Sequence, residues 1–408
     1  MTSINPLIEK IQKTGFQFFQ DFSNFRSEKG YGLTVDHTGN LDLASIASTG
    51  FALSSYVIGV KNGYISHGDA LIKVVGTLKT LHDNVPHYHG FFAHFLDIHT
   101  AERSKKCEYS TIDTALALNG VITVAGYFKE KEVQHLANAI LARVDWDHLI
   151  HLHKGKKRLY MAFNPDADGD YVNGKPGFIH HWSMLAEQLM MYVMYAGTHS
   201  QRDALELYES FERKRVQYDD ASYLSSPGNA LFVYQYPLAW LNLKDITDHQ
   251  GISWFQNVQQ AILGHYRLSR DIAKDYPTFG KHYFGLTASY GIQGYQVCEA
   301  LPNVNHRLHT DGSVAPNAMI GSLPFQAELS LKAIELLFKE EHVWDERYGF
   351  KNAFNNVPQR WIAQRYLGID KGLEMLMANA YLTQDVYDAY HHHPLIKRGM
   401  EILQWKKR

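Results

Sequence analysis

The sequence predicts an all-α protein whose helices pair into two concentric rings. Apolar residues recur with helical periodicity along most of the 408-residue chain. This periodicity marks about eleven or twelve helices joined by loops. The length alone would allow two or three domains, but no Ser/Gly tract, low-complexity run or charge block separates one part from another. We therefore expect a single domain over residues 1–408.

The helices expected in the first half are supported by apolar faces and by capping residues. Ile8, Ile11 and Phe16 give the first helix its apolar side, and Ser66 with Asp69 forms an imperfect capping box. Between the helices, apolar and polar residues alternate along residues 90–100, which favours a strand of a hairpin. The expected helices span residues 6–22, 41–60, a segment that opens at Ser66, 111–128 and 130–144.

The second half continues the helical pattern, interrupted by glycine-rich segments. Residues 168–177 and 289–294 are rich in glycine and are expected to form loops at the rim of the ring. Loops at one end of such a fold usually carry the binding surface. The expected helices span residues 182–196, 200–214, 253–269, 325–338, 369–382 and 394–403.

Composition narrows the class of partner. The formal net charge is −2 and no basic stripe is present, which argues against nucleic acid as a partner. Aromatic residues make up 13% of the chain, and aromatic rings cover the apolar faces of sugars well, although most of these rings should fill the core. A neutral partner such as an oligo- or polysaccharide is the natural expectation.

Targeting and redox signals are sparse. Two cysteines are too few for a disulfide framework. The first residues lack a charged segment followed by an apolar one, and no run of about 18 apolar residues occurs. We expect a cytoplasmic protein with no membrane contact, or a periplasmic one if a signal has been removed.

Glu187 is the clearest candidate for a catalytic residue. It lies in the run from Trp182 to Tyr195, where almost every neighbour is apolar or aromatic. A carboxyl group in such surroundings loses hydration, which favours its protonated form. A proton-donating acid is what cleavage of a glycosidic bond needs. The alternative is a structural glutamate paired with an arginine or lysine.

Seven segments recur in the same order in one known family. They include Thr-Ala-Ser at 287–289 and Tyr-Leu-Gly-Ile-Asp-Lys-Gly at 366–372. The chain thereby resembles the glucoamylase-like domain family that includes bacterial endo-β-1,2-glucanases and a domain of cyclic β-1,2-glucan synthases. The resemblance runs from about Phe16 to Leu403 and implies an (α/α)6 barrel that hydrolyses β-glucan by inversion. The segments are 40–51, 90–97, 108–114, 285–289, 311–316, 321–325 and 366–372.

The resemblance implies that Glu187 is the acid, because the family's Asn-Glu-Ala-Met block overlays residues 186–189. The catalytic base is open among three aspartates. Asp370 ranks first, because a carboxylate at a helix start would keep a low pKa and stay ionised. Asp113 ranks second and Asp311, in a turn, third. The first two also suit ordinary helix caps and the third an ordinary turn.

Candidate sugar contacts are aromatic or amide residues. Gln235 and Tyr236 resemble the family's His-Gln-Tyr block, and packing inside the protein is the alternative for each residue of this set. The chain departs from the family where Asn242 and Tyr290 replace aspartates and where Met184-Leu185 replaces Gly-Tyr. These departures leave substrate preference, and activity itself, open. The full set is Phe91, Phe92, His94, Gln235, Tyr236, Trp240, Asn242, Tyr290, Asp311 and Trp361.

No metal or cofactor is expected. The 23 histidines include the pairs His151-Leu-His153 and His180-His181, but none has a recognised metal-ligand spacing. The acidic run at 166–170 fails the pattern of an EF-hand loop and suits a solvated turn. The prediction is a glycoside hydrolase for β-linked glucan, most plausibly β-1,2-glucan. The alternatives are a carbohydrate-binding protein that lost turnover, and a lyase or epimerase on the same helical fold.

Overall fold

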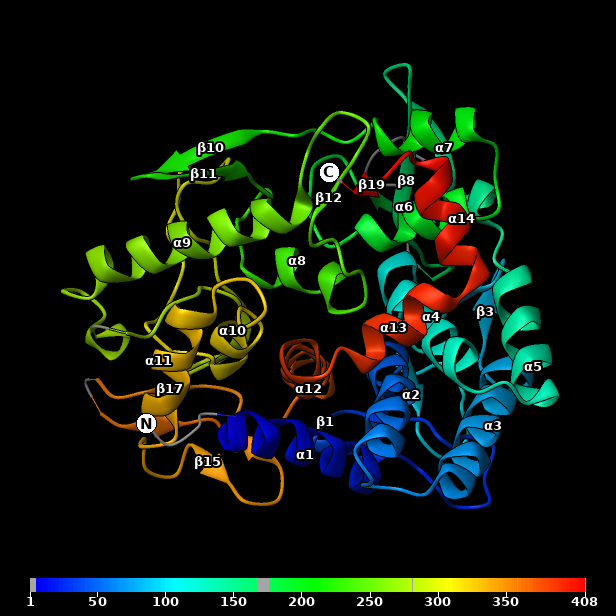
Figure 1. Cartoon of the computed structure of the whole chain (residues 1–408), viewed down its shortest axis with the longest axis horizontal. Helices are drawn as coiled ribbons and strands as arrows, with labels where there is room; N and C mark the ends of the chain where they lie inside the picture. Colours follow the sequence, from blue (N-terminus) through cyan, green and yellow to red (C-terminus); the bar gives the residue numbers. More distant parts are fainter. Residues whose placement is uncertain (1–4, 167–175, 281, 358, 408) are drawn as a thin grey trace.

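The computed structural model describes residues 5–166, 176–280, 282–357 and 359–407. Most of the acidic run at 166–170, and of the loop expected at 168–177, lies outside these residues. The chain is mainly helical with short strands (Figure 1). The α-helices are α1 (Asn5–Phe22), α2 (Ile46–Lys61), α3 (His67–Asp83), α4 (Thr111–Tyr127), α5 (Lys131–Ala142), α6 (Leu189–Ala196), α7 (Gln201–Tyr208), α8 (Phe232–Gln235), α9 (Trp254–Ile272), α10 (Pro316–Ile320), α11 (Ala327–Leu337), α12 (Gly368–Leu382), α13 (Asp385–His392) and α14 (Pro394–Ile402).

Some helices are buried on all sides, and others bury only one face. Nearly all residues of α2, α4, α6 and α12 are buried. Helices α1, α3, α5 and α9 bury one face and leave the other to solvent, as amphipathic outer helices do. Figure 1 looks nearly along α12, with α1, α2, α10 and α13 around it.

Two glycines bring α2 and α4 into close contact. A Cβ atom added to Gly50 would lie 2.2 Å from the carbonyl oxygen of Leu116, and one added to Gly120 would lie 2.2 Å from the carbonyl oxygen of Gly50. The two backbones therefore pack against each other with no side chain between them.

The strands are short and gather in small antiparallel sheets. β8 is the longest and pairs with β6, β7 and β9, while β2 pairs with β1 and β5. The strands are β1 (Val35–His37), β2 (Asn40–Ser45), β3 (His87–Tyr88), β4 (Phe91–Phe92), β5 (Phe95–Asp97), β6 (Tyr109–Ser110), β7 (Ile150–His153), β8 (Lys156–Phe163), β9 (Phe178–His181), β10 (Arg215–Tyr218), β11 (Ala221–Leu224), β12 (Ile246–Thr247), β13 (Ala288–Gly291), β14 (Gly294–Val297), β15 (Trp344–Asp345), β16 (Gly349–Phe350), β17 (Phe354–Asn355), β18 (Trp361–Ile362) and β19 (Lys406–Lys407).

Strands lead directly into the first turns of the buried helices. Ser45 ends β2 and caps α2, and Ser110 ends β6 and caps α4. A bridge from His37 of β1 to Leu367, the residue before α12, holds the starts of α2 and α12 together. The first turns of α2 and α12 therefore meet at the β1–β2 pair, whereas the first turn of α4 follows β6 of the neighbouring sheet.

Several sequence predictions for elements are confirmed. The helices expected at 6–22, 111–128, 253–269 and 369–382 are present within a few residues, and Ser66 caps α3. The segment 90–100 contains β4 and β5 as expected.

Two helix predictions start in the wrong place. The helix expected at 41–60 begins at Ile46, because residues 40–45 pair with β1 and β5. The helix expected at 182–196 begins at Leu189, because the preceding residues bond elsewhere: the indole nitrogen of Trp182 donates to Thr111 Oγ1 at 3.0 Å, and Met184 forms a bridge with Glu212. The helix expected at 200–214 ends at Tyr208, and β10 follows. None of the helices in the described ranges is long and apolar enough to cross a bilayer.

Candidate active site

Glu187 lies in the irregular link between β9 and α6, not within a helix as the sequence suggested. Gln188, whose side chain is fully buried, fixes this link. Its Oε1 accepts from the backbone nitrogen of Ala186 at 2.7 Å, and its Nε2 donates to the carbonyl oxygen of Met184 at 2.8 Å. The backbone on either side of Glu187 is thereby held by a side chain from the core.

The electrostatic environment favours the protonated form of Glu187. The side chain keeps some exposure, but the protein around it removes most of its hydration, and burial raises the pKa of the carboxyl to about 7. The negative charge of Asp113 adds to this rise. A raised pKa keeps the proton available near neutral pH, which is what a general acid requires.

Asp370 is buried in the first turn of α12 and accepts three hydrogen bonds. Asn317 Nδ2 donates to Oδ1 at 2.6 Å, and the hydroxyl of Tyr236 donates to the same oxygen at 3.4 Å. Asn352 Nδ2 donates to the other carboxylate oxygen. Each donor is better satisfied by an ionised carboxylate than by a protonated one.

The sequence prediction of a low pKa for Asp370 is wrong. Burial and the negative charge of Glu374 raise the pKa of Asp370 to about 7, although the donors and Lys371 act in the other direction. Leu367, not Asp370, occupies the N-cap position of α12. The loss of hydration outweighs the helix terminus, which the sequence could not reveal.

A histidine bridges two carboxylates beside α4. His94 Nδ1 lies 2.8 Å from Glu108, and its Nε2 lies 3.4 Å from Asp113. Burial alone would lower the pKa of His94, but Asp113 and Glu108 together raise it to about 9. The imidazole is therefore positively charged at neutral pH. Ser110 also donates to Asp113, at 2.6 Å, so this carboxylate is held on two sides.

Two tyrosines link these groups. The hydroxyl of Tyr236 donates to Asp370 at 3.4 Å, and the pKa of Tyr236 is raised by burial and then by Asp370, Tyr295 and Glu187. The pKa of Tyr295, on β14, is likewise raised by burial and by Asp370 and Asp36. Carboxyl groups from β1, α12 and the β9–α6 link therefore share one region of the molecule.

Sequence reasoning missed five residues of this region. Glu108 opens one of the recurring segments and so offered a signal, whereas Asp36 lies between Val35 and His37 in a short polar stretch and offered none. Tyr295 had none beyond its place in a glycine-rich turn. The asparagines carry no local sign of their role, since an amide that supports a buried carboxylate is recognisable only in three dimensions. The five are Asp36, Glu108, Tyr295, Asn317 and Asn352.

Several predicted sugar contacts are core residues and must be corrected. Phe91, Phe92, Gln235 and Trp240 have no exposed surface. Gln235 Nε2 donates to the carbonyl oxygen of Ala318 at 2.8 Å. The indole nitrogen of Trp240 donates to Ser54 Oγ at 2.9 Å, and Arg143 covers the ring of Phe92. These side chains stabilise helix packing and are not available to a sugar.

Three further predicted sugar contacts lie on or beside surface hairpins. Tyr290 and Trp361 lie on hairpins and are partly exposed. Asp311 holds the β13–β14 hairpin, because its carboxylate accepts from the backbone nitrogen of Ile292 at 2.7 Å and from Gln296 Nε2 at 2.9 Å. Asp311 therefore braces this hairpin.

Asn242 is separated from the carboxyl groups. Its backbone nitrogen donates to His391 Nε2 at 2.9 Å. His391 belongs to α13, which packs against the last turn of α4 at Gly126, whereas Asp113 lies in the first turn. Asn242 therefore lies toward the opposite end of the buried helices and is not a sugar contact of this site.

Comparisons with known proteins agree with this fold. A curated relative, the "Exo beta-1,2-glucooligosaccharide sophorohydrolase (non-reducing end)" of Parabacteroides distasonis, is 23% identical over 433 residues, covering 98% of this chain and 58% of the relative. The chain thus spans less than two thirds of that protein's length.

Two solved structures are similar over nearly the whole chain. The endo-β-1,2-glucanase of Chitinophaga pinensis, in complex with sophorotriose and glucose, has a TM-score of 0.84 at 21% identity, covering 100% of this chain and 99% of that one. The β-1,2-glucanase of Parabacteroides distasonis has a TM-score of 0.83 at 20% identity, covering 99% of this chain and 60% of that one.

The family model "Glycoamylase: Putative glucoamylase" matches residues 179–394, which is more than half of the chain and includes both Glu187 and Asp370. The chain therefore belongs to this glucoamylase-like family.

Proposed function

We propose that this protein is a glycoside hydrolase that cleaves β-1,2-glucan or its oligosaccharides. The observation that supports it most is a pair of carboxyl groups whose pKa values are both raised by burial, of which Asp370 is also held by three hydrogen-bond donors. Glu187 sits where burial favours the proton, and Asp370 accepts three donors that favour the charge. The relatives named for activity on β-1,2-glucans support the choice of linkage.

In the proposed reaction, Glu187 donates its proton to the glycosidic oxygen as the bond to the anomeric carbon breaks. Asp370 takes a proton from a water molecule, whose oxygen bonds to the anomeric carbon from the opposite face. One water is consumed, the leaving sugar gains the proton of Glu187, and the configuration inverts. Such a pair needs its carboxyl groups about 6.5–9.5 Å apart, to leave room for the water.

Asp113 is the second choice for the base. Its carboxylate is held by Ser110 and by the charged His94, which would keep it in place but also neutralise part of its charge. We therefore assign it to positioning and to raising the pKa of Glu187 rather than to activating water.

We further infer that the paired helices form an (α/α)6 barrel and that residues 1–408 are one catalytic domain. The division between buried helices and outer amphipathic helices supports this arrangement. The substrate would lie across the end where the strands lead into α2, α4 and α12. Tyr290, Tyr295 and Trp361 are the aromatic residues we propose for contacts with sugar rings.

Product analysis with linear β-1,2-glucan tests the proposal, with β-1,3- and β-1,4-glucans as controls. The wild-type protein should release oligosaccharides from the β-1,2-glucan, and Glu187→Gln should not, while keeping its fold. Glu212→Gln is the matched control, because Glu212 is an exposed glutamate on the neighbouring segment.

Two results would overturn the proposal. Binding without cleavage of any glucan would favour a carbohydrate-binding protein. A product that absorbs in the ultraviolet would indicate a lyase.

A further inference from the structure

Three histidines from two separate strands meet on one face of a small sheet. His151 and His153 are two residues apart in β7, so their side chains share a face. His181 ends β9, and both strands pair with β8. His153, His151 and His181 pair with Lys156, Arg158 and Tyr160 of β8, respectively. These three residues of β8 alternate along the strand, so they point to the same side of the sheet. The register therefore brings all three imidazoles to one side of the sheet.

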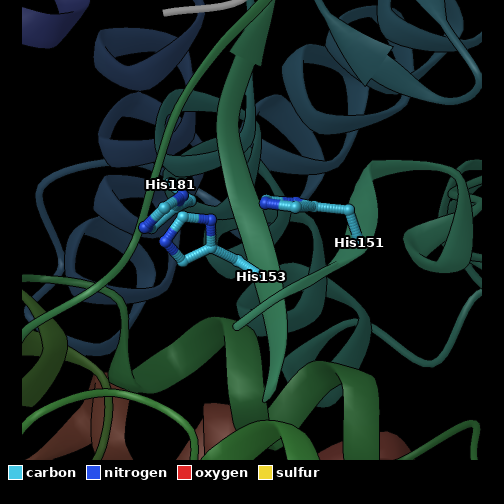
Figure 2. A group of neighbouring side chains, drawn as sticks. All are labelled: His151, His153 and His181. Atoms are coloured by element: carbon cyan, nitrogen blue, oxygen red, sulfur yellow. The ribbon is translucent and has the colours of Figure 1, made fainter. Parts of the chain in front are cut away.

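The rings are close enough to share a ligand. One ring nitrogen of each histidine lies within 4.8 Å of the others. The ring centroids of His153 and His181 are 4.6 Å apart, and those of His151 and His181 are 5.4 Å apart. Figure 2 shows the ring of His151 pointing toward the other two. A metal bound at about 2.0–2.1 Å needs nitrogens about 3.3 Å apart, which small side-chain rotations would achieve.

The donor set selects a class of metal. Three imidazole nitrogens suit Zn²⁺ and neighbouring transition metals, whereas Ca²⁺ and Mg²⁺ prefer oxygen ligands. His151 is buried and stacks on Tyr160 with ring centroids 3.8 Å apart, so its ring has a fixed orientation. His153 and His181 are partly exposed, which leaves a route for the ion.

We propose that His151, His153 and His181 bind one Zn²⁺ ion, with water at the fourth position. The site differs from the sequence prediction of no metal, because the two histidine pairs lie about 30 residues apart and only the pairing of β7 and β9 with β8 joins them. It also stands apart from the proposed hydrolysis, since neither Glu187 nor Asp370 is among the ligands.

The site adjoins the segment that carries Glu187. Trp182 follows His181 directly and bonds to Thr111 at the start of α4. A metal that ties β9 to β7 would fix the strand from which this segment departs. Bound Zn²⁺ would therefore act as a structural clamp on the β7–β9 sheet.

A second cluster provides an internal control. His89, Asp145 and His148 also bring ligand atoms together, but the rings of His89 and His148 stack face to face at 3.5 Å. His148 also bonds to the hydroxyl of Tyr88 at 2.8 Å. An ion shared by this second cluster would have to open the stack of the two rings.

Isothermal titration of chelator-treated full-length protein with ZnCl₂ tests the proposal. The wild type should bind one equivalent, and His153→Gln and His181→Gln should each weaken binding by about tenfold or more. His180→Gln, an exposed histidine on the opposite face of β9, and His148→Gln in the second cluster should bind as the wild type does.

Co²⁺ supplies a spectroscopic readout, because a tetrahedral Co²⁺ site absorbs visible light strongly. The wild type should show this absorption, and His153→Gln should lose it. Circular dichroism confirms that each variant is folded. Wild-type protein that binds no Zn²⁺, or binding that survives in both ligand variants, or is lost in His148→Gln instead, would overturn the assignment.

Discussion

The carboxyl group of Glu187 holds its proton more tightly in the folded chain than in the unfolded chain, where its pKa is near 4.5. Stability from this group is fully present below about pH 4.5 and is lost as the pH rises through 7. A glutamine at position 187 cannot ionise, so the folded variant does not lose stability as the pH rises. We expect Glu187→Gln to raise the free energy of unfolding at about pH 8 by on the order of 1–3 kcal/mol.

Urea denaturation of both proteins at about pH 8 and pH 4.5 measures this difference. It should be large at the higher pH and nearly vanish at the lower one. Equal stabilities at both values would show that the side chain is well hydrated and would remove the physical basis for its role as an acid.

The hydrogen bond from Asn352 to Asp370 should be visible in the pH dependence of activity. Activity should fall at low pH as Asp370 gains a proton and at high pH as Glu187 loses one, so the profile should be a narrow bell near neutral pH. Asn352→Ala removes a donor that favours the charged form of Asp370 and should move the low-pH limb to higher pH. Asn242→Ala, at the far end of the helices, should leave that limb where it is.

At the residue scale the sequence singled out Glu187, whose raised pKa the structure supports and whose catalytic role stays a prediction, while five of the ten proposed sugar contacts lie in the core or away from the carboxyl groups. An acid in an apolar run has few explanations, so Glu187 could be singled out. Trp240 and Gln235 look the same in the sequence whether they face a substrate or Ser54 and Ala318. The direction in which a side chain points depends on the packing of distant helices, and one sequence does not contain that information in readable form.

The contact between α2 and α4 predicts a strong effect of a single methyl group. In Gly120→Ala the new Cβ would meet the carbonyl oxygen of Gly50, a backbone atom that cannot rotate away. The helices would have to separate, which should cost about 1–3 kcal/mol or more. Gly68→Ala in α3 is the control, because nothing lies within 4 Å of its added Cβ, and it should be neutral or stabilising by up to about 1 kcal/mol.

Thermal unfolding of the two alanine variants measures both effects. A melting temperature of Gly120→Ala equal to that of the wild type would contradict the close contact between the backbones of α2 and α4.

The sequence predicted helices correctly where apolar residues recur with helical periodicity over a long, uninterrupted segment. Helices α1 and α9 have one apolar face over four or more turns, and the sequence located both. Residues 150–163 were missed because β7 and β8 form one sheet with β6 and β9, and these pairings are not visible in the local sequence pattern. The start of α6 was misplaced because the bond from Trp182 to Thr111 joins residues 71 positions apart.

The two ends of the chain are tied into the whole molecule. α1 packs on α12, where a Cβ on Gly15 would lie 2.8 Å from that of Met375, and β19 pairs with β12. We therefore expect cooperative unfolding of residues 1–408 in a single calorimetric transition. Two resolved transitions, or a stable proteolytic fragment that lacks α12, would contradict a single domain.

The β13–β14 hairpin is a different segment of the chain from the β9–α6 link and α12, which carry the two carboxyl groups, and the backbone nitrogen of Tyr290 joins it to the site by donating to Asn352 Oδ1 at 2.6 Å. It is braced by Asp311, and β13 and β14 pair with each other but with no other strand of the described residues. We therefore expect the turn of this hairpin to tolerate changes in length that leave Glu187 and Asp370 in place. Under the proposed function, such changes would alter which chain ends or chain lengths fit beside the carboxyl groups.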